Sequence, residues 1–129
     1  MIGANNDNDG YANTLVWINA YNNGVVNNSD APYLAYFYDP NNTERHDNWY
    51  LPARNELTAL FNSIDFSDIN TSLQNNEGQQ ILTEKYYWSS TEIDGDHAYR
   101  IKRQDNQASV DDKDKDKSEY VRAFKEIGG

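Results

Sequence analysis

The sequence contains no cysteine, few basic residues and no long apolar run. Without cysteine there is no disulfide bond, no thiolate nucleophile and no zinc site with cysteine ligands. Eleven Lys and Arg stand against 21 Asp and Glu, which gives a formal net charge of -10 and a sequence pI near 4.4. Such a chain repels the phosphates of nucleic acids and the surface of anionic membranes. No stretch reaches the roughly 18 apolar residues that a membrane-spanning helix needs.

Asparagine and aromatic residues are what the sequence has in abundance. The 129 residues include 18 Asn, 10 Tyr and 3 Trp. The aromatic content is too high for a disordered polymer, and the length is typical of one domain. We expect a polar lead-in over residues 1–12, because MIGANNDNDG has no apolar periodicity, and a single domain over residues 13–129. The opening lacks the basic start and apolar stretch of a signal peptide, so we expect none in this chain.

Apolar spacing predicts two short helices in the first half of the chain. The first covers residues 14–22, where Trp17, Ile18 and Tyr21 have approximately helical spacing. The second covers residues 53–64 and follows Pro52, a residue suited to a helix start. Its apolar stripe at i, i+3, i+4 and i+7 consists of Leu57, Leu60, Phe61 and Ile64. A weaker turn of helix is expected after Ser67.

The remaining segments predict a sheet late in the chain. After Gly78 the period shortens, and β-rich runs predict strands over 86–91, 99–103 and 120–124, with a hairpin connection at 93–96. Residues 104–119 suit a loop or exposed edge strands. For residues 33–38 (YLAYFY) two alternatives stay open, a buried strand or the wall of an aromatic cluster, with loops at 29–32 and 41–47 and a turn at 39–42. The expected class is therefore α+β, with two short helices packed on a small twisted antiparallel sheet with long loops.

Residues typical of catalytic or metal sites are sparse. The two histidines, His46 and His97, lie in loop-like sequence, and no G-x-S-x-G motif is present. Carboxylates at Asp112, Asp114 and Asp116 have the D-x-D-x-D spacing of a calcium loop, but Lys follows where Gly is needed. Residues 5–10 begin a second such pattern that lacks its last ligand. We expect no cofactor, and calcium is the one ion that these spacings leave open.

Four short blocks occur in order along the chain. They are GYANT at 10–14, DNWYLPARNEL at 47–57, YWSSTE at 87–92, and AY at 98–99 followed by YVRAF at 120–124. Together they resemble the sequence pattern of the Lcl C-terminal domain family. Two departures are Ala53, where the family has a Ser cap, and Lys125, where it has a final Arg.

The resemblance implies a C-type-lectin-like fold and a non-enzymatic, ligand-binding role. Domains of this kind are display modules of surface, adhesin or phage-tail proteins, and several are the variable proteins of diversity-generating retroelements. The implied location is extracellular, on a cell surface or virion, within a larger protein for which a homo-oligomer is one option. The implied partner is a protein or glycan on another cell, with no nucleic acid and no membrane insertion.

The expected binding face lies within residues 99–119, which hold few apolar residues to bury and many polar ones to present. An acidic, Lys-studded face favours a partner with basic patches and a salt-sensitive association. Two alternatives remain: a carboxylate-based hydrolase, or a structural assembly head in which this stretch is buried between protomers. The residues expected to bind ligand are Tyr99, Arg100, Lys102, Gln104, Asp105, Asn106, Gln107, Ser109, Asp111, Asp112, Asp114 and Asp116.

Overall fold

The computed structural model describes residues 3–24, 30–38, 49–75, 80–94, 96–115 and 117–125. Over these ranges the chain is α+β, as predicted, with four helices where two short helices and a weaker helical turn after Ser67 were expected; the weaker turn is the full helix α4. The elements, in order, are α1 (Gly10–Asn22), α2 (Ala31–Tyr36), β1 (Trp49–Tyr50), α3 (Arg54–Asn62), α4 (Phe66–Asn75), β2 (Tyr87–Glu92), β3 (His97–Gln104), β4 (Gln107–Asp114) and β5 (Phe124–Lys125).

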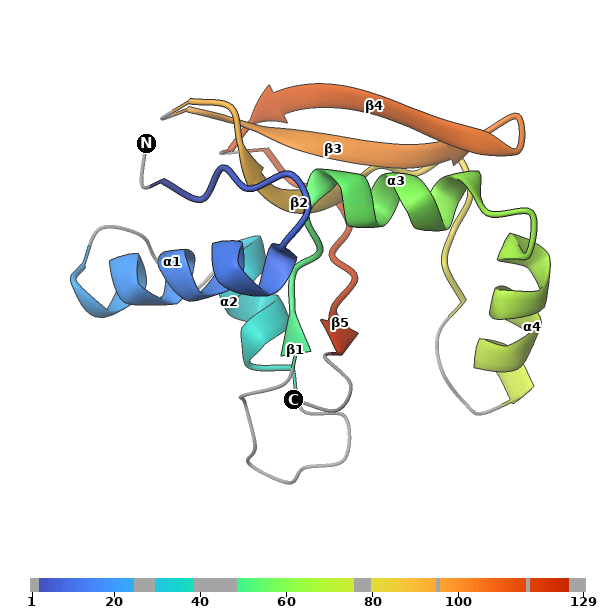
Figure 1. Cartoon of the computed structure of the whole chain (residues 1–129), viewed down its shortest axis with the longest axis horizontal. Helices are drawn as coiled ribbons and strands as arrows, with labels where there is room; N and C mark the ends of the chain where they lie inside the picture. Colours follow the sequence, from blue (N-terminus) through green and yellow to red (C-terminus); the bar gives the residue numbers. More distant parts are fainter. Residues whose placement is uncertain are drawn as a thin grey trace.

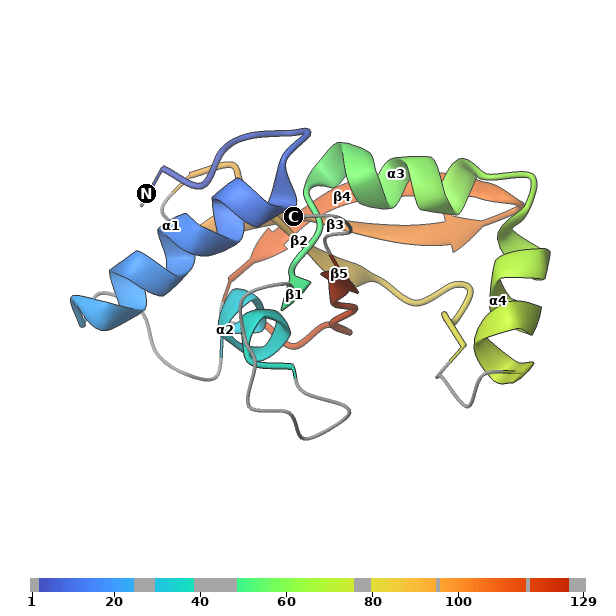
Figure 2. The ribbon, with the colours of Figure 1, turned by 60° about the horizontal axis from the view of Figure 1, so that its bottom comes forward.

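The strands form two small antiparallel sheets (Figure 1). The larger has the order β2-β3-β4, so that β3 is central and β4 is an edge strand. The smaller pairs β1 with β5 and thereby joins the middle of the chain to its end. Helix α3 runs alongside the β3–β4 hairpin, α4 turns away from it, and α1 lies toward the other end of the molecule (Figures 1 and 2).

The first hydrophobic core lies between the larger sheet and helices α3 and α4. Leu57 and Phe61 of α3 are fully buried there against Phe66, Tyr87 and Ile101, with Ile81 alongside. The predicted apolar stripe of residues 53–64 is correct at Leu57, Leu60 and Phe61. It fails at Ile64, which is 96% exposed. Helix α3 ends at Asn62, and the extended backbone of Ser63 turns the chain so that Phe66 takes the buried place.

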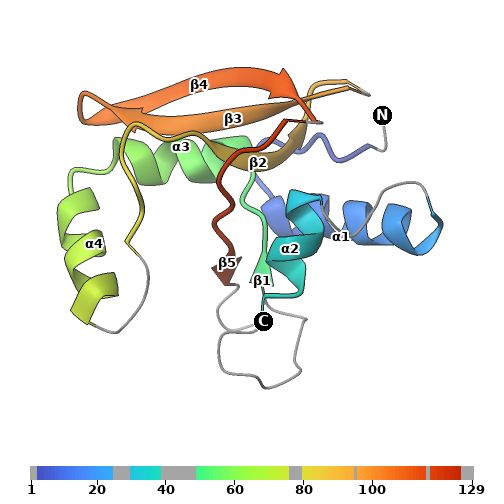
Figure 3. The same ribbon diagram turned by 180° about the vertical axis from the view of Figure 1, so that it is seen from behind.

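The second core lies on the other side of the larger sheet. Trp88 and Ala98 of the sheet are buried there with Leu51 and with Ala35 of α2. Figure 3 shows this side, where the segment before β5 runs beside β2 on its way to β1. Because both sides of the sheet are covered near β2, every residue of that strand is buried. The expectation that Tyr87 and Trp88 belong to the core is confirmed.

The start of the domain lies earlier than predicted. Helix α1 begins at Gly10 because Asp9 caps it, its carboxylate accepting a hydrogen bond from Ala12 N at 3.0 Å. Ala4 is fully buried, and its amide donates to the Glu92 carboxylate. Residues 3–12 are therefore part of the packed structure, and the expected boundary after residue 12 falls inside α1.

The missing Ser cap of α3 is replaced from a distant strand. Ala53 cannot accept a hydrogen bond through its side chain, but the Thr91 hydroxyl accepts one from Arg54 N at 3.0 Å. The Glu56 carboxylate accepts the Ala53 amide at 3.0 Å and so keeps the other half of a capping box. A long-range contact thus satisfies a helix end that the local sequence leaves open.

Two predicted extended segments are wrong. Residues 31–36 form helix α2, with Pro32 and Ala35 buried at helical spacing. The strand alternative for 33–38 is therefore wrong, and the loop expected at 29–32 is wrong at residues 31 and 32. The aromatic-cluster alternative holds, since the Tyr33 ring lies 4.8 Å from that of Tyr21 and 4.5 Å from that of Phe37. The turn and loop expected within 39–47 lie outside the described residues.

The predicted strand at 120–124 is also not continuous. Tyr120 makes one isolated parallel bridge to Tyr87, and only Phe124 belongs to β5. The chain leaves the edge of β2 after Tyr120, whose carbonyl accepts from Trp88 N, and crosses to β1. The run of β-prone residues at 120–124 therefore contacts the larger sheet at Tyr120 and joins the smaller sheet at Phe124.

Candidate functional site

The β3–β4 hairpin is the most regular part of the region expected to bind ligand. Eight residue pairs follow one another without a shift, from His97 with Asp114 to Gln104 with Gln107. The turn between the strands is Asp105–Asn106, and both residues have positive φ, 54° and 65°. This is the conformation of a two-residue hairpin turn that matches the twist of the strands. The edge-strand alternative for residues 104–119 is therefore correct for 107–114.

The expected binding residues do not share one surface. Ile101 is buried against α3, and successive residues of a strand point to opposite sides, so its neighbours Arg100 and Lys102 point away from that helix. Residues directly opposite each other in an antiparallel pair share a side. The six that lie on the side away from α3, here called the outer hairpin face, are Arg100, Lys102, Gln104, Gln107, Ser109 and Asp111.

The outer hairpin face is organised around Arg100. Its guanidinium lies 2.8 Å from the Asp111 carboxylate and 2.7 Å from that of Glu119, and it stacks over the Tyr86 ring at 3.8 Å. Burial lowers the pKa of Arg100, but the two carboxylates outweigh it and raise that pKa. The same contact with Arg100 lowers the pKa of Asp111. Lys102 also lies over Tyr86, at 4.6 Å, so this face holds charges of both signs.

The other expected residues lie elsewhere. Tyr99 and Asp112 face α3, and the Arg54 guanidinium of α3 covers the Tyr99 ring at 4.6 Å. Asp114 is also on that side, opposite His97. Asp105 and Asn106 form the exposed tip, and Asp116 is outside the described residues. The single acidic face that we expected is thus divided between two sides of the hairpin and its tip.

His97 joins the β2–β3 connection to the end of β4. Its Nδ1 lies 2.9 Å from Asp94 Oδ1 and its Nε2 lies 2.8 Å from Asp114 Oδ1. The hydrogen bond with Asp94 is the main reason that the pKa of His97 rises above its ordinary value of 6.5. The backbone amide of Asp96, followed by His97, lowers the pKa of Asp94 below its ordinary value of 3.8.

The charge of His97 should make stability depend on pH. A histidine whose pKa is higher in the folded state than in the unfolded chain stabilises the fold fully at a pH below the unfolded-state pKa. This stabilisation is lost as the pH rises through the folded-state pKa. We expect the unfolding free energy of wild type to fall more than that of His97→Gln between about pH 5.5 and about pH 8.5. Comparing the two proteins removes the effect of other titrating groups. An NMR titration that placed the His97 pKa at or below 6.5 would contradict this.

Residues of the incomplete calcium-loop pattern at 5–10 have other roles. Asp7 pairs with Arg54 at 2.9 Å, Asp9 caps α1, and the Asn6 side chain accepts hydrogen bonds from the amides of Asn8 and Asp9. In the part of the chain that the structure describes, no three His, Asp or Glu side chains are grouped to hold a metal ion. The second candidate includes Asp116, which is not described.

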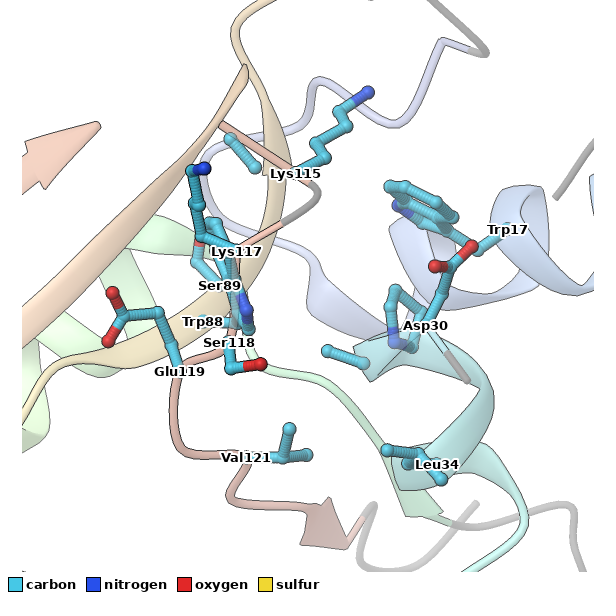
Figure 4. Close-up of a pocket in the computed structure, with 13 residues that line it drawn as sticks. Trp17, Asp30, Leu34, Trp88, Ser89, Lys115, Lys117, Ser118, Glu119 and Val121 are labelled. Atoms are coloured by element: carbon cyan, nitrogen blue, oxygen red, sulfur yellow. The ribbon is translucent and has the colours of Figure 1, made fainter. Parts of the chain in front are cut away.

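Sequence reasoning missed a pocket of about 220 Å³ between α1, α2 and the larger sheet. Figure 4 shows Trp17, Asp30 and Leu34 on one side of it, across from Trp88, Lys117 and Ser118. The lining residues are Trp17, Asp30, Ala31, Pro32, Leu34, Trp88, Ser89, Ala98, Lys115, Lys117, Ser118, Glu119 and Val121. These residues are far apart in the sequence and are brought together only by folding, so no local sequence pattern could have predicted the site.

The geometry is that of a small α+β domain in which the β1–β5 pair joins the middle of the chain to residues 124–125 and the β3–β4 hairpin presents polar side chains. The pattern of the Lcl C-terminal domain family matches residues 7–125, nearly the whole chain, and the protein belongs to this family. No curated protein and no solved structure shows significant similarity to the chain. Among the described helices, none has the length and apolar character to span a bilayer.

Proposed function

We propose that this chain is a non-enzymatic, ligand-binding display domain of a larger protein, with a C-type-lectin-like fold. In this proposal it is presented outside the cell, on a cell surface or virion, and recognises a protein or glycan on another cell. The observation that carries the proposal is the β3–β4 hairpin. It is a regular eight-pair ladder packed on α3 through one side, with an outer face made of polar side chains.

The outer hairpin face supports recognition because it is held in place before a ligand arrives. Arg100 is fixed between Asp111, Glu119 and the Tyr86 ring, which lowers the entropy cost of using it in binding. The core residues Ile101 and Tyr87 lie on the opposite side of the sheet. Substitutions at Lys102, Gln104 and Gln107, toward the turn of the hairpin, therefore leave that first core unchanged, which suits a variable protein of a diversity-generating retroelement.

The partner chemistry we favour differs from the acidic face expected from the sequence. Asp112 and Asp114 lie on the α3 side, while the outer hairpin face combines Arg100 and Lys102 with Asp111. A face with both signs of charge and two glutamines recognises a polar surface through matched hydrogen bonds. It does not depend on a strongly basic partner.

The test is binding of the fluorescently labelled domain to a panel of intact bacterial cells and to a printed glycan array. A variant that changes the outer hairpin face without touching a buried residue should weaken the binding at least about tenfold. Its melting temperature should stay that of wild type. The substitutions are Lys102→Ser, Gln104→Ser and Gln107→Ser.

A control variant carries the same three changes of residue type at exposed positions that do not belong to the outer hairpin face. These substitutions are Gln74→Ser, Gln80→Ser and Lys85→Ser. The proposal requires that the control bind like wild type. Equal loss in both variants, no binding by wild type, or a change of oligomeric state in place of a change in binding would each overturn it.

A further inference from the structure

The pocket between α1, α2 and the sheet has the size of a site for one ring. Its volume of about 220 Å³ is below the roughly 300–1,000 Å³ of pockets that hold drug-sized ligands. Trp17 and Trp88, each 7% exposed, form aromatic parts of the wall, and Leu34 and Val121 lie at its lower end in Figure 4. An occupant therefore meets flat apolar surface inside the pocket.

Polar groups surround this apolar interior with balanced charge. The lining contains two basic residues, Lys115 and Lys117, and two acidic ones, Asp30 and Glu119. Lys115 is paired with the buried Glu92 carboxylate, and Glu119 is paired with Arg100 at 2.7 Å. These pairs neutralise one charge of each sign, so the site has no net preference for an anion or a cation.

Some donors in the wall have no partner among the described residues. The Trp17 Nε1 atom is buried and makes no hydrogen bond there. Lys117 and Ser118 are exposed at the pocket, and their side chains make no hydrogen bond or ion pair with any residue that the structure describes. A ligand that brings its own acceptors and donors would satisfy these groups, whereas a purely apolar ligand would leave them desolvated.

We propose that this pocket binds an uncharged, hydroxylated ring, the chemistry of a single neutral pyranose sugar at the end of a glycan. The ring's C–H faces pack on Trp17 or Trp88, and its hydroxyl groups exchange hydrogen bonds with Lys117 and Ser118. The size, the aromatic wall and the balanced charge each favour this class over an anionic ligand or an apolar side chain. The site is separate from the outer hairpin face and does not depend on the function proposed for that face.

The experiment is a titration of tryptophan fluorescence, with saturation-transfer NMR, using methyl glycosides of glucose, galactose and mannose. For a ligand of about a dozen heavy atoms we expect a dissociation constant on the order of 1 mM for at least one of them. Substituting Ser118→Phe places a ring at the pocket without removing a buried group, and it should weaken binding at least about tenfold. The matched control is Ser67→Phe, on the exposed surface of α4, which should bind like wild type.

Three results would overturn the proposal. They are no saturable binding of any of the three glycosides, tighter binding of glucuronate than of the neutral sugars, and tighter binding of cyclohexanol than of the sugars. The second would mean that the lysines dominate, and the third would mean that the pocket anchors an apolar side chain. Because cell binding by the outer hairpin face is measured separately, failure here is distinguishable from failure there.

Discussion

Replacing Gly10 by Ala should destabilise the domain by about 3 kcal/mol, with a fall in melting temperature of about 10 °C. A Cβ atom at this position would lie 2.5 Å from Ala53 N, 2.5 Å from Leu51 O and 2.6 Å from Glu56 Oε1. Two of these are backbone atoms that hold β1 and α3 in place. The chain cannot relieve the overlap without moving the start of α1 away from both elements.

The sign of the stability change in Gly10→Ala shows whether steric overlap or helix propensity dominates at this position. Gly10 is the first residue of α1, and at an open helical position Ala is better than Gly by about 0.5–1 kcal/mol. The control is Asn19→Ala, an exposed position of the same helix, where a neutral or slightly stabilising change is expected. Urea unfolding of wild type, Gly10→Ala and Asn19→Ala measures the change in unfolding free energy for each variant. If Gly10→Ala were as stable as wild type, the close approach of the three segments would be wrong.

The family block GYANT has a physical explanation in the same contacts. Gly10 allows the close approach, and its amide donates to Glu56 at 2.8 Å. The Thr14 hydroxyl accepts from Leu51 N at 3.0 Å, and the Asn13 side chain bonds both backbone groups of Asn6. Asn13 and Thr14 are fully buried polar residues. Both residues join α1 to other segments, Thr14 to the residue after β1 and Asn13 to the N-terminal segment.

Elements with a strong local pattern were predictable from the sequence. The stripe at Leu57, Leu60 and Phe61 indicated α3, and the β-rich run at 99–103 indicated β3. Helix α2 was not, because six residues give too little periodicity to separate a helix from a buried strand. The strand at 120–124 was overestimated because β-propensity cannot say which sheet edge a segment meets.

The division of the candidate face follows from strand geometry. Twelve residues between 99 and 116 were expected to share one surface, yet neighbours on a strand point to opposite sides. Arg100 and Tyr99 therefore face different environments, and Asp111 and Asp112 do too. Had the hairpin turn at Asp105–Asn106 been assigned first, this register would have divided the residues correctly. The pocket could not have been assigned in this way, because its wall is formed by residues that are distant in the sequence.

Replacing Glu92 by Ala should have the largest effect, a loss of about 3–5 kcal/mol. The side chain of Glu92 is fully buried at the end of β2. One carboxylate oxygen accepts the amides of Gly3 and Ala4, each at 2.9 Å, and the other bonds Lys115. Removing the carboxylate leaves two backbone donors and an ammonium group without their shared acceptor, and the amide of the fully buried Ala4 has no water to replace it.

A graded series distinguishes this explanation from simple loss of packing. Glu92→Gln keeps the shape and one acceptor oxygen, so we expect it to cost less than Glu92→Ala. Lys115→Met leaves the carboxylate with its two amide donors and should cost less again. Urea unfolding gives the three free energies, and the double variant of Glu92 and Lys115 gives their coupling. Equal losses for Gln and Ala would mean that the carboxylate's hydrogen bonds contribute little.

The same carboxylate connects stability to the pocket. Lys115 lines the pocket and its ammonium lies 5.1 Å from the centre of the Trp17 ring, so Glu92 fixes a cation against one wall. In Glu92→Gln that restraint weakens while the fold survives. Hydrogen exchange at the amides of Gly3 and Ala4 should then accelerate, together with a change in Trp17 fluorescence. If only the exchange changed, Glu92 would anchor the N-terminal segment alone, and the pocket wall would be held by α1 and α2 without it.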